Sequence, residues 1–83
     1  MPEILIYTKK WCGYCSAAKD LLQRLELSFT EVDVTGDQAR HEEMLQRSDG
    51  RRTVPQIFVD GVGIGGYDDL SRLVREGSFP PNP

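Results

Sequence analysis

The chain has 83 residues, of which 28% are charged, and its formal net charge is −3 at pH 7. This length supports one small domain over residues 1–83, with a single hydrophobic core. The acidic balance argues against nucleic acid as a partner, and no apolar run approaches the roughly 20 residues that a membrane-spanning helix needs.

Cysteine usage bears on location. The chain has two cysteines, Cys12 and Cys15, whereas small secreted domains held by disulfides usually carry four, six or eight. A bridge across so short a loop would remove little entropy from the unfolded chain. The first ten residues also lack the charged region and apolar stretch of a signal peptide. We therefore expect a soluble, cytoplasmic, monomeric protein in which the pair is not a structural crosslink.

The first half of the chain predicts a strand, a helix and a second strand. Residues 3–8, EILIYT, are apolar and free of breakers, as in a central strand buried on both faces. Apolar residues then recur at the spacing of one helical face and predict a helix over residues 13–26. They are Ala18, Leu21, Leu22 and Leu25. Residues 28–34 alternate apolar and polar and predict the second strand.

The second half predicts two helices around a hairpin. TGDQ, beginning at Thr35, has the form of a capping box and introduces a mostly polar helix to about residue 47. Two short strands, 56–59 and 62–64, are joined by Asp60 and Gly61, which favour a type I′ turn. A last helix opens at residue 67 and ends near Gly77, and the proline-rich tail, residues 78–83, is expected to be frayed.

The element order β-α-β-α-β-β-α predicts an α/β fold with a four-stranded mixed sheet and three helices. The first two strands should be parallel, because a strand–helix–strand connection crosses over in a right-handed sense. The closing hairpin should add an antiparallel pair.

The spacing of Cys12 and Cys15 favours a redox dithiol. A structural zinc site needs four ligands, and one cysteine pair with His41 cannot supply them within one chain. No metal site is expected there, although a site shared between two chains stays open. Cys12 falls where a helix begins, beside Lys9 and Lys10, and such surroundings stabilise the thiolate that attacks disulfides. Cys15, one turn later, is placed to resolve a mixed disulfide.

Three motifs together carry a family resemblance. WCGYC ends at Cys15, TVP begins at Thr53 and GGYDD begins at Gly65. In this order and spacing they closely resemble the glutaredoxin family, in particular its bacterial dithiol type, over nearly the whole chain except the tail. The resemblance implies a thioredoxin-like fold and a glutathione-dependent thiol–disulfide oxidoreductase. It further implies that Cys12 attacks protein disulfides and glutathione mixed disulfides, and that Cys15 resolves.

The resemblance also implies a site for glutathione as co-substrate. The backbone of Val54, before a cis Pro55, would pair with the cysteinyl part, and Asp68 would contact the γ-glutamyl amino group. The implied contacts are Lys9, Tyr14, Thr53, Val54, Pro55, Gly66, Tyr67, Asp68 and Asp69. Judged from the residues alone, Asp68 and Asp69 fit helix capping as well, and Lys9 fits a solvated side chain.

Two alternatives remain open at this point. Most dithiol relatives have proline where this chain has Gly13. Some family members with glycine there dimerise around a [2Fe–2S] cluster held by the first cysteine and glutathione, although Cys15 argues against the single-cysteine carrier type. Trp11 before the pair also echoes thioredoxin, so the other alternative is a redoxin driven by thioredoxin reductase. GGYDD argues against it, because a glutathione site would have no purpose there.

Overall fold

Strand β1 (Ile4–Thr8) lies at the centre of the sheet, between β2 (Thr30–Asp33) and β3 (Gln56–Val59). Strand β4 (Val62–Gly65) completes the order β2-β1-β3-β4. β1 runs parallel to β2 and antiparallel to β3, which pairs antiparallel with β4. Both predicted pairings are therefore confirmed in the computed structural model, which describes residues 2–81.

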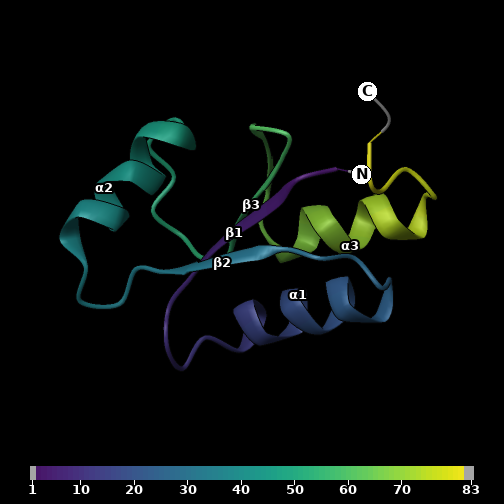
Figure 1. The fold of residues 1–83 in the computed structure, drawn as a ribbon, viewed down its shortest axis with the longest axis horizontal. Helices are drawn as coiled ribbons and strands as arrows, with labels where there is room; N and C mark the ends of the chain where they lie inside the picture. Colours follow the sequence, from purple (N-terminus) through teal and green to yellow (C-terminus); the bar gives the residue numbers. More distant parts are fainter. Residues whose placement is uncertain (1, 82–83) are drawn as a thin grey trace.

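Helices cover both faces of the sheet (Figure 1). Helices α1 (Gly13–Arg24) and α3 (Tyr67–Arg75) pack together on one face, and α2 (Gln38–Arg47) lies on the other. Alternate residues of β1 serve the two faces, as the strand period of two requires. Ile6 joins the core under α1 and α3, while Tyr7 joins the cluster that contains Met44 of α2. Within residues 2–81, no helix is long and apolar enough to cross a membrane.

A buried tyrosine ties α2 to the sheet. The Tyr7 hydroxyl donates a hydrogen bond of 2.5 Å to the Glu43 carboxylate on α2. The Tyr7 ring meets Phe58 of β3 edge-on, with centroids 5.7 Å apart. Burial, and then the hydrogen bond to Glu43, raises the pKa of Tyr7 to about 12. This tyrosine therefore donates to Glu43 throughout the neutral range.

The predicted capping box at Thr35 is wrong. Asp37 caps α2 instead, because its carboxylate accepts the Arg40 N–H at 3.1 Å. Gly36, at φ 66°, turns the chain between the two residues and separates Thr35 from the helix. The Thr35 hydroxyl accepts the Lys10 N–H, 2.8 Å away, and so holds the loop between β1 and α1.

Element ends also differ from the expected ones. β2 is shorter than the predicted residues 28–34, and α1 ends at Arg24 rather than near residue 26. Asp60 and Gly61 have φ values of 51° and 84°, which confirms positive φ at both central positions of the hairpin turn.

The start of the tail is anchored rather than frayed. Gly77, at φ 73°, ends the last helix as predicted. The Ser78 N–H then donates to the Leu73 carbonyl at 2.8 Å, and the Phe79 side chain packs against the core cluster under α1 and α3. Residues 82 and 83 of the predicted frayed tail lie outside the described residues.

Candidate active site

Cys12 occupies the N-cap position of α1. Its Sγ accepts a hydrogen bond of 3.2 Å from the Cys15 N–H, and it lies 3.8 Å from the Val54 carbonyl oxygen. The side chain is partly exposed. The first turn of a helix offers unpaired N–H groups and the positive end of its dipole, which together favour a sulfur anion. This position suits a nucleophilic thiolate.

Cys15 is in a different environment. Only 1% of its surface is exposed, and both cysteines are free thiols. Burial, and then the hydrogen bond with Cys12, raises the pKa of Cys15 to about 12. Cys15 therefore keeps its proton at neutral pH, so the geometry separates an accessible sulfur from a buried one.

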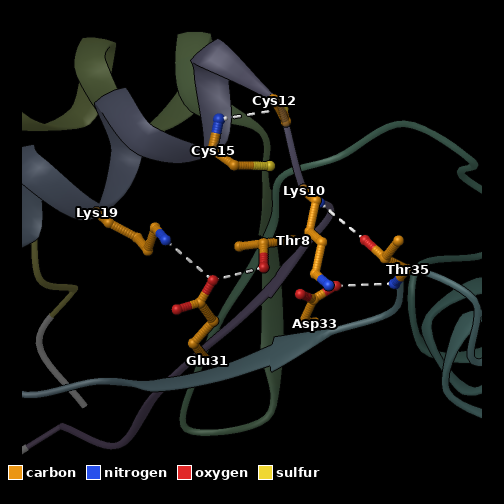
Figure 2. A network of polar contacts seen from close by, with 8 residues as sticks. All are labelled: Thr8, Lys10, Cys12, Cys15, Lys19, Glu31, Asp33 and Thr35. Atoms are coloured by element: carbon orange, nitrogen blue, oxygen red, sulfur yellow. Dashed lines mark hydrogen bonds and ion pairs between the residues drawn. The ribbon is translucent and has the colours of Figure 1, made fainter.

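Polar contacts beneath the pair hold the loop in place (Figure 2). The Thr8 hydroxyl donates a hydrogen bond of 2.6 Å to the Glu31 carboxylate, which also accepts one of 3.0 Å from Lys19 of α1. The hydrogen bond from Thr8, aided by Lys19, holds the pKa of Glu31 below its usual range. Glu31 of β2 is thus bonded both to the end of β1, before the cysteine loop, and to α1, after it.

A cleft of about 230 Å³ opens beside the cysteine loop. Three separate segments form it: the start of α1, the loop before β3, and the turn into α3. The residues that line it are Tyr14, Arg51, Thr53, Val54, Pro55, Gly66, Tyr67, Asp68 and Asp69. All the glutathione contacts implied by the sequence are therefore brought together, with the exception of Lys9.

Lys9 does not line this cleft. Its exposed side chain lines a separate depression, bordered by the turn before α2 and by His41. The reason is the course of the chain: Lys9 follows the last residue of β1, beside the turn that carries Thr35. Lys9 therefore lies outside the cleft that the other implied contacts line, and its contact with glutathione stays a prediction.

Arg51 is the cleft residue that sequence reasoning missed. The segment GRR reads as a solvated loop, yet Arg51 lines the cleft and its guanidinium lies 4.0 Å from the Asp69 carboxylate. A usable signal exists, since residues two apart in an extended chain point to the same side. Thr53 was already expected at the site, and Arg51 stands two positions before it.

The two acidic residues at the start of α3 have different surroundings. Asp69 is a capping residue, because its carboxylate accepts the Gly66 N–H at 3.0 Å and lies 3.6 Å from the Arg72 guanidinium. Gly65 makes room for it: a Cβ there would sit 2.1 Å from the Asp69 carboxylate, at a φ of 109°. Asp68 is exposed and lines the cleft. Asp68 is thus the carboxylate available to a ligand.

The cleft has a backbone wall and an aromatic wall. The Val54–Pro55 peptide is cis, as the resemblance implies. The Val54 carbonyl oxygen lies 3.8 Å from the Cys12 sulfur, and Val54 lines the cleft. On the other side the rings of Tyr14 and Tyr67 lie 6.0 Å apart at a tilt of 33°. Through Val54 the cleft therefore adjoins the Cys12 sulfur.

The described residues do not assemble a metal centre by themselves. Residues 2–81 contain no group of three or more histidine, cysteine or acidic side chains arranged to hold an ion. Of the two cysteines, Cys12 is partly exposed and Cys15 is buried. A cluster at Cys12 would therefore need ligands that the other described residues do not supply.

Comparison with known proteins agrees with this geometry. The glutaredoxin family profile matches residues 4–64. Glutaredoxin 3 of Escherichia coli is 49% identical over 98% of this chain and 96% of its own length. The solution structure of glutaredoxin from Brucella melitensis is 45% identical, with a TM-score of 0.79 over 92% of this chain and 82% of that one. The crystal structure of a buckwheat glutaredoxin–glutathione complex is 32% identical, with a TM-score of 0.82 over 94% of this chain and 73% of that one.

The fold, the dithiol at the start of α1 and the matched profile lead to one conclusion. The chain belongs to the glutaredoxin family, the glutathione-dependent thiol–disulfide oxidoreductases, and it carries the dithiol form of their active site.

Proposed function

We propose that Cys12 is the attacking thiolate, that Cys15 is the resolving thiol, and that the cleft beside them binds glutathione. One observation carries the assignment. The accessible Cys12 sulfur accepts a helix N–H and adjoins the cleft, whereas the Cys15 sulfur is buried and protonated. Disulfide exchange needs a sulfur that a substrate can reach and that the surroundings favour as an anion. The partly exposed Cys12 at the N-cap of α1 suits this role better than the buried Cys15.

A glutathionylated protein requires Cys12 alone. The Cys12 thiolate attacks the glutathione sulfur, a Cys12–glutathione disulfide forms, and the protein leaves as a thiolate that takes a proton from water. The thiolate of a second glutathione then attacks the glutathione sulfur on Cys12. Oxidised glutathione leaves and Cys12 is a thiolate again, so electrons and atoms balance without a metal.

A protein disulfide requires both cysteines. Cys12 attacks one sulfur, and a mixed disulfide forms while the other target sulfur leaves as a thiolate. Cys15 then loses its proton and attacks the Cys12 sulfur, which releases the target as a dithiol and leaves a Cys12–Cys15 disulfide. Two glutathione molecules reduce that disulfide and leave as oxidised glutathione.

The cleft chemistry suits glutathione, which has two carboxylates, one amino group and a peptide backbone. The cysteinyl part would lie along Thr53 and Val54, between the aromatic rings and the backbone wall. The first turn of α3, after Gly66, offers N–H groups to the γ-glutamyl carboxylate, and Asp68 lines the cleft where it can meet the amino group. Tyr14, Pro55, Tyr67 and Asp69 complete the site. Arg51, rather than Lys9, supplies a cation within the cleft.

A direct test measures turnover of a glutathionylated peptide with glutathione and glutathione reductase. Turnover that saturates with the peptide and depends on glutathione is expected. Its absence in a folded, metal-free sample would overturn the proposal. A brown, dimeric protein after growth with iron and glutathione would favour the cluster carrier. Reduction driven by thioredoxin reductase without glutathione would favour the redoxin.

Arg51→Met should raise the KM for the glutathionylated peptide by roughly threefold to tenfold, because a half-exposed charged contact is worth about 1 kcal/mol. The kcat should change little. Arg52→Met is the matched control, since Arg52 is exposed and does not line the cleft. Steady-state kinetics of the two variants distinguish a cleft contact from a general loss of positive charge. Equal KM values for Arg51→Met and Arg52→Met would exclude a role for Arg51.

The resolving step should accelerate as pH rises. A raised pKa means that Cys15 is protonated below it, so the attacking fraction grows by about tenfold per pH unit while pH stays below that pKa. Forming the mixed disulfide removes the contribution of the Cys12 thiol to the raised pKa but not that of burial. Rapid quenching and mass spectrometry would follow release of a protein target. A release rate that stays flat between about pH 6 and 8 would contradict a protonated Cys15.

We also propose a cytoplasmic location and a monomeric state. The dithiol cycle needs a compartment in which glutathione keeps thiols reduced. Each step above uses residues of one chain, so no second subunit is required for the reductase chemistry.

A further inference from the structure

Trp11, directly before the nucleophile, is exposed without being part of the cleft. It is the single tryptophan of the chain, and 96% of its surface is open to solvent, more than for Tyr14 at 65%. Tyr14 lines the glutathione cleft, and Trp11 does not. The indole therefore has no assigned contact in the chemistry described so far.

The backbone around Trp11 is held on both sides. Trp11 has a φ of 57°, which bulky side chains rarely adopt. Before it, the Lys10 N–H donates to the Thr35 hydroxyl at 2.8 Å (Figure 2). After it, Cys12 caps α1, and its carbonyl accepts the Ser16 N–H at 3.1 Å. The exposed indole thus sits on an anchored loop, and an unusual conformation kept in this way often marks a functional position.

Any protein disulfide that reacts with Cys12 must come close to Trp11. The Cα atoms of two residues joined by a disulfide lie about 5.5–6 Å apart, and neighbouring Cα atoms of one chain lie about 3.8 Å apart. The Cα of a target cysteine bonded to Cys12 is therefore within about 10 Å of the Trp11 Cα. An indole and the side chains next to that target cysteine can bridge this distance.

We propose that Trp11 is a docking residue for polypeptide disulfides and packs against apolar side chains next to the target cysteine. The proposal rests on the function proposed above. It predicts that Trp11 contributes to the binding of protein disulfides but not to the binding of glutathione. Glutathione is a charged tripeptide without an apolar side chain, and it suits the polar cleft with Arg51 and Asp68. A large exposed indole gains most of its contact energy by burying its ring against apolar side chains, which a polypeptide can supply and glutathione cannot.

Kinetics with two substrates test the proposal. Trp11→Asn removes the indole, and asparagine tolerates positive φ, so the loop is retained. Its KM for a disulfide-bonded peptide with leucines beside the cysteine should rise about tenfold, the scale expected when a central aromatic contact is lost. The KM for a glutathionylated small thiol should stay within about twofold. Trp11→Phe should restore most of the peptide affinity, and Val62→Ala, which alters an exposed residue of β4, should leave both KM values unchanged.

Fluorescence of the single tryptophan gives an independent readout. The Cys15→Ser variant can be trapped as a mixed disulfide with the tryptophan-free leucine peptide, or with glutathione. The peptide adduct should shift Trp11 emission to the blue and protect it from acrylamide, whereas the glutathione adduct should resemble the free protein. Equal emission in the two adducts, or an unchanged peptide KM in Trp11→Asn, overturns the docking role while glutathione turnover continues. Loss of turnover with both substrates in the wild type would instead overturn the proposed function itself.

Discussion

Cys12→Ser should abolish the reduction of a glutathionylated peptide, with a loss of at least about a thousandfold, the scale reached when a covalent nucleophile is removed. A serine hydroxyl at the N-cap of α1 still accepts the helix N–H and preserves the fold. A serine hydroxyl is far less acidic than a thiol and has no sulfur to exchange, so the reaction cannot begin. Cys15 cannot substitute, because it is buried and its pKa is raised to about 12.

Cys15→Ser is the matched control for this prediction. It should keep glutathionylated-peptide turnover within about twofold of the wild type, because the single-thiol route uses only Cys12. With a protein disulfide the same variant should accumulate a mixed disulfide at Cys12, visible by mass spectrometry. Residual activity in Cys12→Ser that disappears in Cys15→Ser would reverse the two assigned roles.

Leu22→Ala should lower the free energy of unfolding by about 3 kcal/mol, within the range of 2–5 for a truncated core leucine. Leu22 of α1 is fully buried, with 0% of its surface exposed, in the cluster that joins α1 and α3 to the sheet. Ile6 of β1 and Leu70 of α3 belong to the same cluster. The loss would be a large share of the 5–15 kcal/mol that stabilises a typical domain.

Urea denaturation followed by circular dichroism measures this effect through the midpoint and the slope. Val62→Ala, at a residue that is 67% exposed on β4, is the control and should stay within about 0.5 kcal/mol of the wild type. A Leu22→Ala midpoint equal to that of the wild type would mean that α1 is not held by this core. Helix α1 carries both cysteines, so its anchoring also underlies the active-site geometry.

Local patterns in the sequence were sufficient for the architecture. Residues close together in the sequence are enough to predict three features of the fold. These are the central strand β1 from its apolar run, helix α1 from the spacing of Ala18 and Leu22, and the hairpin turn from Asp60 and Gly61. The cysteine spacing, TVP and GGYDD likewise identified the family and eight of the cleft residues. Each of these signals lies within a few consecutive residues, which is why a sequence reveals them.

Tertiary structure decided the features that depend on which segments meet. Arg51 lines the cleft and Lys9 lines a separate depression, because only the packing of the loops fixes the side to which each cation points. Asp69 became a cap and Asp68 stayed open, a distinction that neighbouring identical carboxylates cannot signal in sequence.

The same holds for two contacts far apart in the chain. Thr35 bonds to the cysteine loop instead of capping α2, and Phe79 closes the core instead of fraying. The sequence by itself determined the order of elements, the dithiol and the family, because these are written in local periodicity and motif spacing. The partners of polar side chains that bond across long stretches of the chain were decided only by the fold, because such a hydrogen bond forms with whatever residue the packed chain brings within reach.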